Sequence, residues 1–242
     1  TTDDGVVDVI DLMPMGDRRA DVIRRVRGRS GTVRMEEVLR IRFDYAAAVP
    51  WIRQAPEHSG REDFEHALIA VAGPDSVIVR GPRMQAGDFS HRAEFDVREG
   101  ENVDIVLTWY PSHRPPPDIV DVDERIARTA EWWRDWFRNV TDLGDYGAAV
   151  QRSLLVLRAL THEDTAGIVA AVTTSLPEQF GGSRNWDYRY VWLRDASLTL
   201  QALMLHGFEA EAEAWRRWLL RAIAGDPADV QIMYGLAGER RL

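Results

Sequence analysis

A proline-rich segment divides this chain into two parts with different hydrophobic patterns. The segment PSHRPPPD, residues 111–118, contains three consecutive prolines. Proline fixes φ and has no backbone N–H, so such a run cannot lie inside a helix or a central strand. We therefore interpret it as a stiff connector and as the main domain boundary.

The residues before the connector have the pattern of β-strands. NVDIVLTWY, residues 102–110, alternates apolar and polar side chains, and a glycine-containing turn precedes it. Residues 93–110 are therefore predicted to form a hairpin. Three further segments have a strand pattern: residues 5–12, 38–45 and 75–81. Short strands separated by turns predict an antiparallel β-sandwich domain over residues 1–112, whose first strands we expect to precede Thr1.

The residues after the connector have a helical period. Apolar side chains recur every three to four residues from Asp123 to Val140, which predicts a helix within a linker over residues 113–141. Residues 148–162 are apolar on most faces, as expected of a helix buried on both sides. Gly207 and Gly225 are expected to end two later helices. The succession of helices over residues 142–242 predicts a bundle or a barrel of helix pairs that continues beyond Leu242.

Composition and charge restrict the possible ligands. The net charge is -9, all 30 basic residues are arginine and cysteine is absent. Electrostatic binding to nucleic acid or to anionic membranes is therefore not expected, and a neutral substrate is expected instead. The absence of cysteine suits a cytoplasmic location. No metal or cofactor is expected, because the histidines have no metal-binding spacing; they are His58, His66, His91, His113, His162 and His206.

The segment NWDYRYVWLRD, residues 185–195, contains four aromatic rings, two arginines and two aspartates. Aromatic faces pack against the C–H faces of a sugar, while arginine and carboxylate groups bind its hydroxyls. The alternative is a buried corner, with Asp195 as the N-cap of a helix beginning near Ala196 and Arg194 as its buried partner. Composition alone leaves these two interpretations about equal.

Other tryptophans lie at helical spacing. Residues 131–137 read EWWRDWF, in which Trp133 and Phe137 belong to the apolar stripe, and Trp215 and Trp218 are three residues apart. A sugar-binding groove is conceivable for such a cluster, but the spacing favours packing in a hydrophobic core.

A longer stretch around the aromatic segment resembles the bacterial branch of glycoside hydrolase family 15, the glucoamylase, glucodextranase and trehalase group. The resemblance is carried by RSLLVLRALTHEDTAGIVAAVTTSLPEQFGGSRNWDYRYVWLRDASLTLQAL, AWRRWLLRAI and QIMYGLAGERRL in this order, and upstream by VVDVIDLMP, RRVRGRSGTVRMEEVLRIRFDYA and EWWRDWF. It implies an N-terminal β-sandwich followed by an (α/α)6 barrel. It also implies inverting hydrolysis of a terminal α-glucosidic bond.

The resemblance assigns roles to four residues of the segment. Tyr188, Trp192, Arg194 and Asp195 match the positions that line the subsite for the non-reducing-end glucose. By this resemblance Arg194 and Asp195 hold sugar hydroxyls, and Tyr188 lies near the ring that acquires positive charge. None of these four is the general acid or base.

The chain departs from the family pattern in several respects. The two catalytic carboxyls of the family are expected beyond Leu242, so this fragment alone should be inactive. Glu178 and Glu239 match neither of them, although Glu239 is a candidate for the pocket rim. Val172 and Val191 replace other residues of the family, which we regard as tolerated changes. The alternative function is a non-catalytic carbohydrate-binding or scaffold protein of the same fold; trehalase, glucoamylase or dextran-type specificity and the oligomeric state stay open.

Overall fold

A computed structural model describes residues 1–242 except 17–18, 45, 57–65, 139, 142, 173–177 and 242. Two compact units are present, Thr1–Arg134 and Asp135–Leu242, which we call the sheet unit and the helical unit. The proline-rich connector lies inside the sheet unit and forms neither helix nor strand after Pro111.

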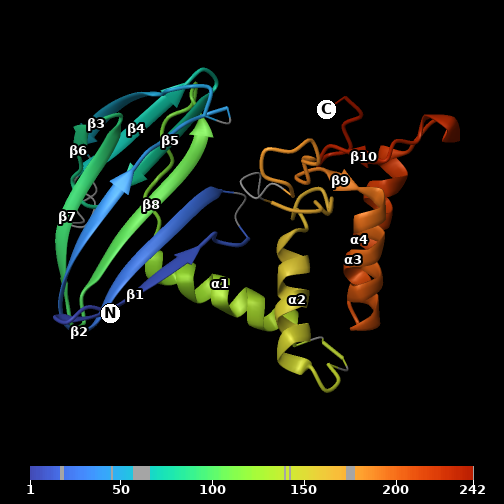
Figure 1. The fold of residues 1–242 in the computed structure, drawn as a ribbon, viewed down its shortest axis with the longest axis horizontal. Helices are drawn as coiled ribbons and strands as arrows, with labels where there is room; N and C mark the ends of the chain where they lie inside the picture. Colours follow the sequence, from blue (N-terminus) through green and yellow to red (C-terminus); the bar gives the residue numbers. More distant parts are fainter. Residues whose placement is uncertain are drawn as a thin grey trace. The chain divides into compact units, whose positions relative to one another are not determined.

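The sheet unit is built on an eight-stranded antiparallel sheet that is strongly curved (Figure 1). Its strands are β1 (Gly5–Leu12), β2 (Ala20–Leu39), β3 (Trp51–Pro56), β4 (His66–Ala72), β5 (Asp75–Arg80), β6 (Gln85–Gly87), β7 (Ser90–Arg98) and β8 (Asn102–Pro111). The order is β3-β4-β5-β8-β2-β7-β6, and β1 pairs with β2. One continuous curved sheet therefore takes the place of the two separate sheets that define the expected sandwich.

Strands β7 and β8 do not form the hairpin predicted for residues 93–110. They lie end to end along β2: β7 pairs with Thr32–Leu39, and β8 pairs with Ala20–Arg27. At the junction the Gly28 N–H donates to the Glu101 carbonyl oxygen at 2.9 Å. A Cβ atom on Gly28 would lie only 1.9 Å from the Arg98 carbonyl oxygen. Only glycine therefore permits this close crossing of the two backbones.

The long strand β2 was not recognised in the sequence as one element. Only its last residues were predicted, as part of a strand over residues 38–45. In the structure β2 ends at Leu39, and Phe43 makes only an isolated bridge with Ala48. Tyr45 lies outside the described residues. The predicted strands at residues 5–12 and 75–81 are confirmed as β1 and β5.

The inner face of the curved sheet encloses one hydrophobic core. Its buried residues come from β4, β5, β7, β8 and the loop before β6: Leu68, Val77, Val79, Met84, Ala93 and Ile105. Because these strands belong to both ends of the sheet order, the sheet must fold over to bring them together. Burial of this apolar surface stabilises the curvature of the sheet.

Strand β2 carries a partly buried acidic side chain, Glu37. Glu37 lies two residues before Leu39, so both side chains point to the same face of the strand. Burial raises the pKa of the Glu37 carboxyl to about 7, against the opposing attraction of Arg24. None of the described residues donates a hydrogen bond to its Oε2 atom. The folded protein therefore binds a proton at Glu37 more tightly than the unfolded chain does.

Glu37 should make stability depend on pH. Its folded pKa is raised, so its favourable contribution is complete below the ordinary value of 4.5 and is lost as pH rises through about 7. Glu37→Gln should therefore raise the midpoint of thermal unfolding at pH 8 and change it little at pH 5. Glu36→Gln is the matched control, because Glu36 is exposed and pairs with Arg92. A lower midpoint for Glu37→Gln at pH 8 would contradict this interpretation.

The opposite face of the sheet holds the connector through arginine side chains. Arg19 donates to the Asp118 carbonyl oxygen at 3.0 Å, and Arg80 donates to the Pro117 carbonyl oxygen at 2.7 Å. Arg25 binds Asp104 through two hydrogen bonds of 2.7 and 2.8 Å and also reaches Asp123. Since the side chain of Arg25 is only 5% exposed, this is a buried charge that depends on its partners.

The helical unit contains the end of α1 (Val122–Phe137) and the following elements: α2 (Gly147–Ala159), β9 (Val191–Trp192), α3 (Leu193–Leu205), α4 (Glu209–Ala222), a 3-10 helix η2 (Pro227–Asp229) and β10 (Met233–Tyr234). Trp215 and Trp218 of α4 are buried in its core, which confirms that they pack. Trp136 stacks on Phe208 with ring centroids 4.0 Å apart.

One sequence expectation about the helices is confirmed and another is wrong. Gly207 follows α3 with a φ of 91°, and the Phe208 N–H donates to the Leu203 carbonyl oxygen. This geometry confirms Gly207 as the helix-ending residue. The expectation that residues 148–162 are buried on both sides is wrong. Only Leu154 of α2 is buried, and Val156 is 50% exposed.

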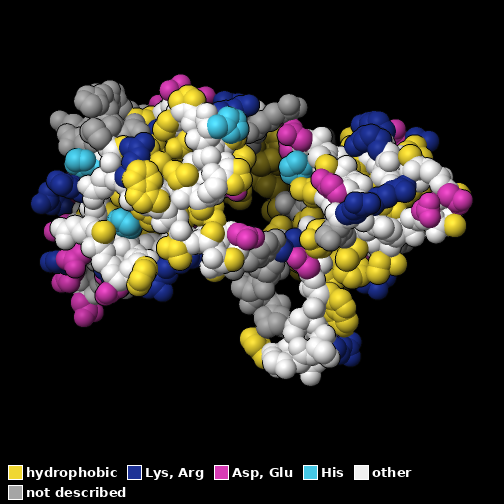
Figure 2. All heavy atoms as spheres, turned by 90° about the horizontal axis from the view of Figure 1, so that it is seen from above, with side chains coloured by type: hydrophobic (Ala, Val, Ile, Leu, Met, Phe, Trp, Pro, Cys, Tyr) yellow, Lys and Arg dark blue, Asp and Glu magenta, His cyan; other side chains and the backbone are white. Residues whose placement is uncertain are grey.

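On the face drawn in Figure 2, arginine and acidic side chains are interspersed. Among the described residues this face shows no large patch of only positive or only negative charge. None of the helices in the described ranges is both long and apolar enough to cross a membrane.

Candidate functional site

The backbone of the aromatic segment is held by two neighbouring segments of the helical unit, residues 170–171 and residues 232–234. Tyr188 and Tyr190 accept hydrogen bonds through their carbonyl oxygens from the amides of Ala171 and Ala170. Val191 and Trp192 form β9, which pairs antiparallel with β10. The Leu193 N–H then donates to the Ile232 carbonyl oxygen at 3.1 Å. These bonds fix the direction in which the chain enters α3.

A buried residue anchors this entry. Val191 is 0% exposed and packs in the core with Tyr234, its partner in the two-stranded pair. Gly167 lies against the same place: a Cβ atom there would be 2.6 Å from the Leu236 carbonyl oxygen and 3.2 Å from the Val191 side chain. Valine at position 191 therefore serves the core, while the residues on either side of it remain accessible.

The aromatic rings of the site lie next to each other. The centroids of the Tyr188 and Trp192 rings are 5.7 Å apart, and their planes are tilted by 37°. The Trp192 indole N–H donates to the Asp187 carbonyl oxygen at 3.1 Å, which fixes the ring orientation. Both side chains are half-buried. The pair can therefore offer apolar ring surface to a ligand.

Arg194 and Asp195 form the charged part of the site. An Nη2 atom of Arg194 lies 3.1 Å from Oδ2 of Asp195, and the two side chains are 75% and 30% exposed. The expectation of Arg194 as a buried partner in a structural corner is therefore wrong. Asp195 is also not the N-cap, because α3 begins two residues earlier and Trp192 occupies the cap position. Asp195 lies in the first turn of α3, where its charge is favourable to the helix dipole.

The charges around Tyr188 connect the two parts of the site. Burial raises the pKa of the Tyr188 phenol; the negative charge of Glu178, a hydrogen bond to it and the charge of Asp195 raise it further. Arg194 acts in the opposite direction. The phenol therefore keeps its proton, and it lies within electrostatic reach of both Arg194 and Asp195. Three of the four predicted site residues thus share one local field, and Trp192 joins them through its ring contact.

Two residues with a role near the site were not predicted to have one. Glu178 accepts a hydrogen bond from the Tyr188 hydroxyl at 3.2 Å. Asn185 uses its amide to close the preceding loop, with bonds of 2.9 to 3.1 Å to the backbone of Gln179 and Gly182. The Gly, Ser and Asn residues at 181–185 are typical of a turn, but no sequence pattern identifies the hydrogen-bond partners of Asn185 or Glu178.

Glu239, the predicted rim residue, lies in a turn of its own. Its carboxylate accepts a hydrogen bond from the Ala237 N–H at 3.0 Å, and its carbonyl oxygen accepts one from the Gly235 N–H at 2.8 Å. These contacts are local and join Glu239 to none of the four other predicted residues. Its place at a pocket rim stays a prediction.

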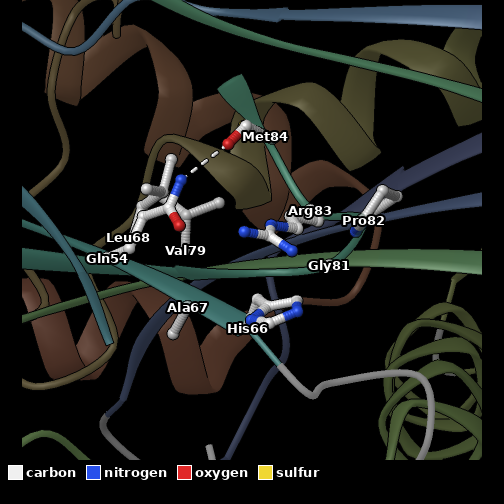
Figure 3. A pocket seen from close by; sticks show the side chains of 9 residues that line it. All are labelled: Gln54, His66, Ala67, Leu68, Val79, Gly81, Pro82, Arg83 and Met84. Carbon is white, nitrogen blue, oxygen red and sulfur yellow. Dashed lines mark hydrogen bonds between the residues drawn. The ribbon is translucent and has the colours of Figure 1, made fainter. Parts of the chain in front are cut away.

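Two hollows of the molecule lie elsewhere. One lies in the sheet unit, where Arg83 and His66 border it and Gln54 donates to the Met84 carbonyl oxygen at 2.8 Å (Figure 3). The other follows α3 along Ser197, Leu200, Gln201, Met204 and Leu205. Neither includes a predicted site residue. Among the described side chains, no three histidine or acidic residues are grouped as a metal site requires.

Comparison with known proteins identifies a family for the part of the chain that contains this segment. Residues 144–242 match the sequence profile of Glycosyl hydrolases family 15. This part of the chain belongs to that family.

Three of the similar proteins are trehalases. The chain is 36% identical to a trehalase of Mycolicibacterium smegmatis over 231 residues, which cover 91% of this chain and 34% of the relative. It is 32% identical to a trehalase of Mycobacterium tuberculosis over 226 residues, with similar coverage. A trehalase of Thermoplasma acidophilum is 48% identical over 88 residues. The chain thus spans about a third of the length of the first two relatives.

A solved structure supports the fold. A bacterial glucoamylase complexed with acarbose superposes with a TM-score of 0.57 at 10% sequence identity, covering 98% of this chain and 44% of that chain. At such low identity the likeness concerns the fold alone. The shared fold is a curved antiparallel sheet followed by helices.

Proposed function

We propose that the full-length protein is an inverting α-glucoside hydrolase that cleaves trehalose. The observation that carries this proposal is the similarity to a trehalase at 36% identity, which extends over 91% of the chain and includes both units. A neutral disaccharide also suits a chain of net charge -9 without a basic surface segment.

In this proposal the chain supplies one wall of the subsite for the non-reducing-end glucose. The rings of Tyr188 and Trp192 pack against the C–H face of the sugar, and Arg194 donates to its hydroxyls while Asp195 accepts from them. Each charge-assisted bond of this kind contributes about 1.5–3 kcal/mol in a dry site. A ligand that lacks the matching hydroxyl would leave Arg194 or Asp195 without a partner once the site is closed around it, and is therefore rejected.

The bond-breaking groups would come from residues outside 1–242. Inversion requires a carboxylic acid that protonates the leaving oxygen and a carboxylate that activates water on the opposite face, roughly 6.5–9.5 Å apart. We propose that the helices of residues 142–242 are the first of an (α/α)6 barrel, whose later helices contribute these two groups. Water then attacks the anomeric carbon as the glucosidic bond breaks, and the new anomer is β.

The test uses the full-length protein and residues 1–242 side by side. Glucose release from trehalose, maltose and isomaltose is measured, and the anomer formed first is identified by NMR. We expect turnover of trehalose by the full-length protein, β-glucose as the first new anomer and no turnover by residues 1–242. An intact protein without activity on any of the three sugars would exclude the hydrolase and favour a carbohydrate-binding role. Inversion of trehalose yields one β-glucose from the attacked ring and one α-glucose as the leaving group, so initial release of α-glucose without β-glucose would exclude inversion.

A further inference from the structure

The Tyr188 hydroxyl has a defined hydrogen-bond partner. It donates to Oε2 of Glu178 at 3.2 Å, across ten residues of sequence. A phenol that donates its single proton in one direction keeps its oxygen lone pairs for another. The position of Glu178 therefore decides which way the oxygen of Tyr188 faces.

Glu178 is held by a loop that has its own internal bonds. The Asn185 side chain donates to the carbonyl oxygens of Gln179 and Gly182, both at 2.9 Å, and accepts from the Gln179 N–H at 3.1 Å. Arg184 lies 3.8 Å from the Glu178 carboxylate. Glu178 thus begins a closed loop of residues 178–185, and its carboxylate is directed by a second charged side chain.

Several charged groups lie near Tyr188. Among the described residues, the group that accepts the hydrogen bond from its hydroxyl is Glu178. Asp195 interacts with the phenol through its charge, and Arg194 opposes that effect, but the hydroxyl bond goes to Glu178. Asp195 instead holds Arg194 at 3.1 Å. The two carboxylates of the site therefore have separate partners: Asp195 pairs with the guanidinium and Glu178 with the phenol.

We propose that Glu178 is a positioning residue, which holds the Tyr188 hydroxyl so that the phenol oxygen faces the bound glucose. This inference rests on the proposed function. As the glucosidic bond breaks, the sugar ring becomes positively charged, and an oxygen whose proton is shared with a carboxylate carries more negative charge toward it. Glu178 acts through Tyr188 and is neither the general acid nor the base.

The kinetic test compares Glu178→Ala and Glu178→Gln in the full-length protein. Glu178→Ala should lower kcat about ten- to a hundredfold, with a smaller change in KM, because the contact matters most when charge develops. Glu178→Gln should recover part of that loss, since its amide oxygen still accepts the hydroxyl proton. Glu213→Gln on the exposed side of α4 is the matched control and should keep the wild-type rate.

A double-mutant cycle separates positioning from a general structural role. Glu178→Ala added to Tyr188→Phe should cost little beyond Tyr188→Phe alone, because the partner hydroxyl is already absent. Independent, multiplying losses would overturn the proposal. So would a normal kcat in Glu178→Ala, whether or not the variant is less stable.

A measurement without turnover keeps this inference distinct from the proposed function. The tyrosinate absorbance that disappears in Tyr188→Phe reports the titration of Tyr188 in the full-length protein. Its apparent pKa should fall in Glu178→Gln, because the neighbouring negative charge is removed. A fall in an inactive protein would support the contact while excluding the hydrolase; an unchanged pKa would overturn the positioning role.

Discussion

Replacing Asp195 by alanine in the full-length protein is expected to lower kcat/KM for trehalose by about a hundredfold or more. Two charge-assisted bonds to sugar hydroxyls, at about 1.5–3 kcal/mol each, correspond to that loss. The effect on folding should be small by comparison. Asp195 provides no side-chain cap to α3, and a favourable charge in the first turn of a helix contributes about 0.3–1 kcal/mol.

The control for this prediction is Glu209→Ala. Glu209 is the first residue of α4 and is also acidic in a first turn, so it reproduces the helix-dipole effect outside the site. Steady-state kinetics and thermal unfolding of both variants give the comparison. An Asp195→Ala protein that is less stable but has normal specific activity would contradict its assignment to the sugar subsite.

Replacing Arg25 by alanine should destabilise the sheet unit by about 3–5 kcal/mol, because Asp104 would remain as an uncompensated buried charge. The side chains of Arg25 and Asp104 are 5% and 15% exposed. Asp123, the second partner of Arg25, is 79% exposed and should contribute much less. Hydrogen exchange of the β2 and β8 amides in the intact protein measures the change in opening free energy.

Two further variants test whether the loss of stability in Arg25→Ala comes from the burial of the charges. Arg34 lies on β2, like Arg25, and pairs with Glu94 of β7 at the exposed surface, so Arg34→Ala should cost much less stability than Arg25→Ala. Arg25→Met combined with Asp104→Leu removes both buried charges and should recover most of the stability. Equal costs for Arg25→Ala and Arg34→Ala would show that burial does not strengthen the dependence on this pair.

The local character of most elements could be predicted from the sequence, whereas their pairing could not. Alternation in residues 93–110 is the same whether two strands form a hairpin or continue end to end along a third. The end-to-end arrangement depends on the close approach of Gly28 to Arg98. These residues are 70 positions apart, so no local sequence pattern contains their contact. The length of β2 could not be predicted either. Its first half pairs with β8 and its second half with β7, and these pairings are not visible in the local sequence.

The candidate site was predicted as a set of residues but not as a geometry. The period of the helix placed its start near Ala196, and the true start at Leu193 moved Asp195 from the cap into the first turn. Arg194 was not distinguishable as buried or exposed, because both alternatives place an arginine beside an aspartate. Glu178 was visible only as a nearby carboxylate; its bond to Tyr188 depends on how the loop closed by Asn185 folds back.

The pairing of β9 with β10 has a consequence for the order of events during synthesis. Residues 188–195 leave the ribosome well before Ile232, Met233 and Tyr234, which align their backbone. Helix α3 can form from its own hydrogen bonds in the nascent chain, but the approach to it has to wait for the returning strand. A translation product that ends between α3 and β10 would carry all four side chains proposed to bind sugar and still lack the strand that orients their backbone.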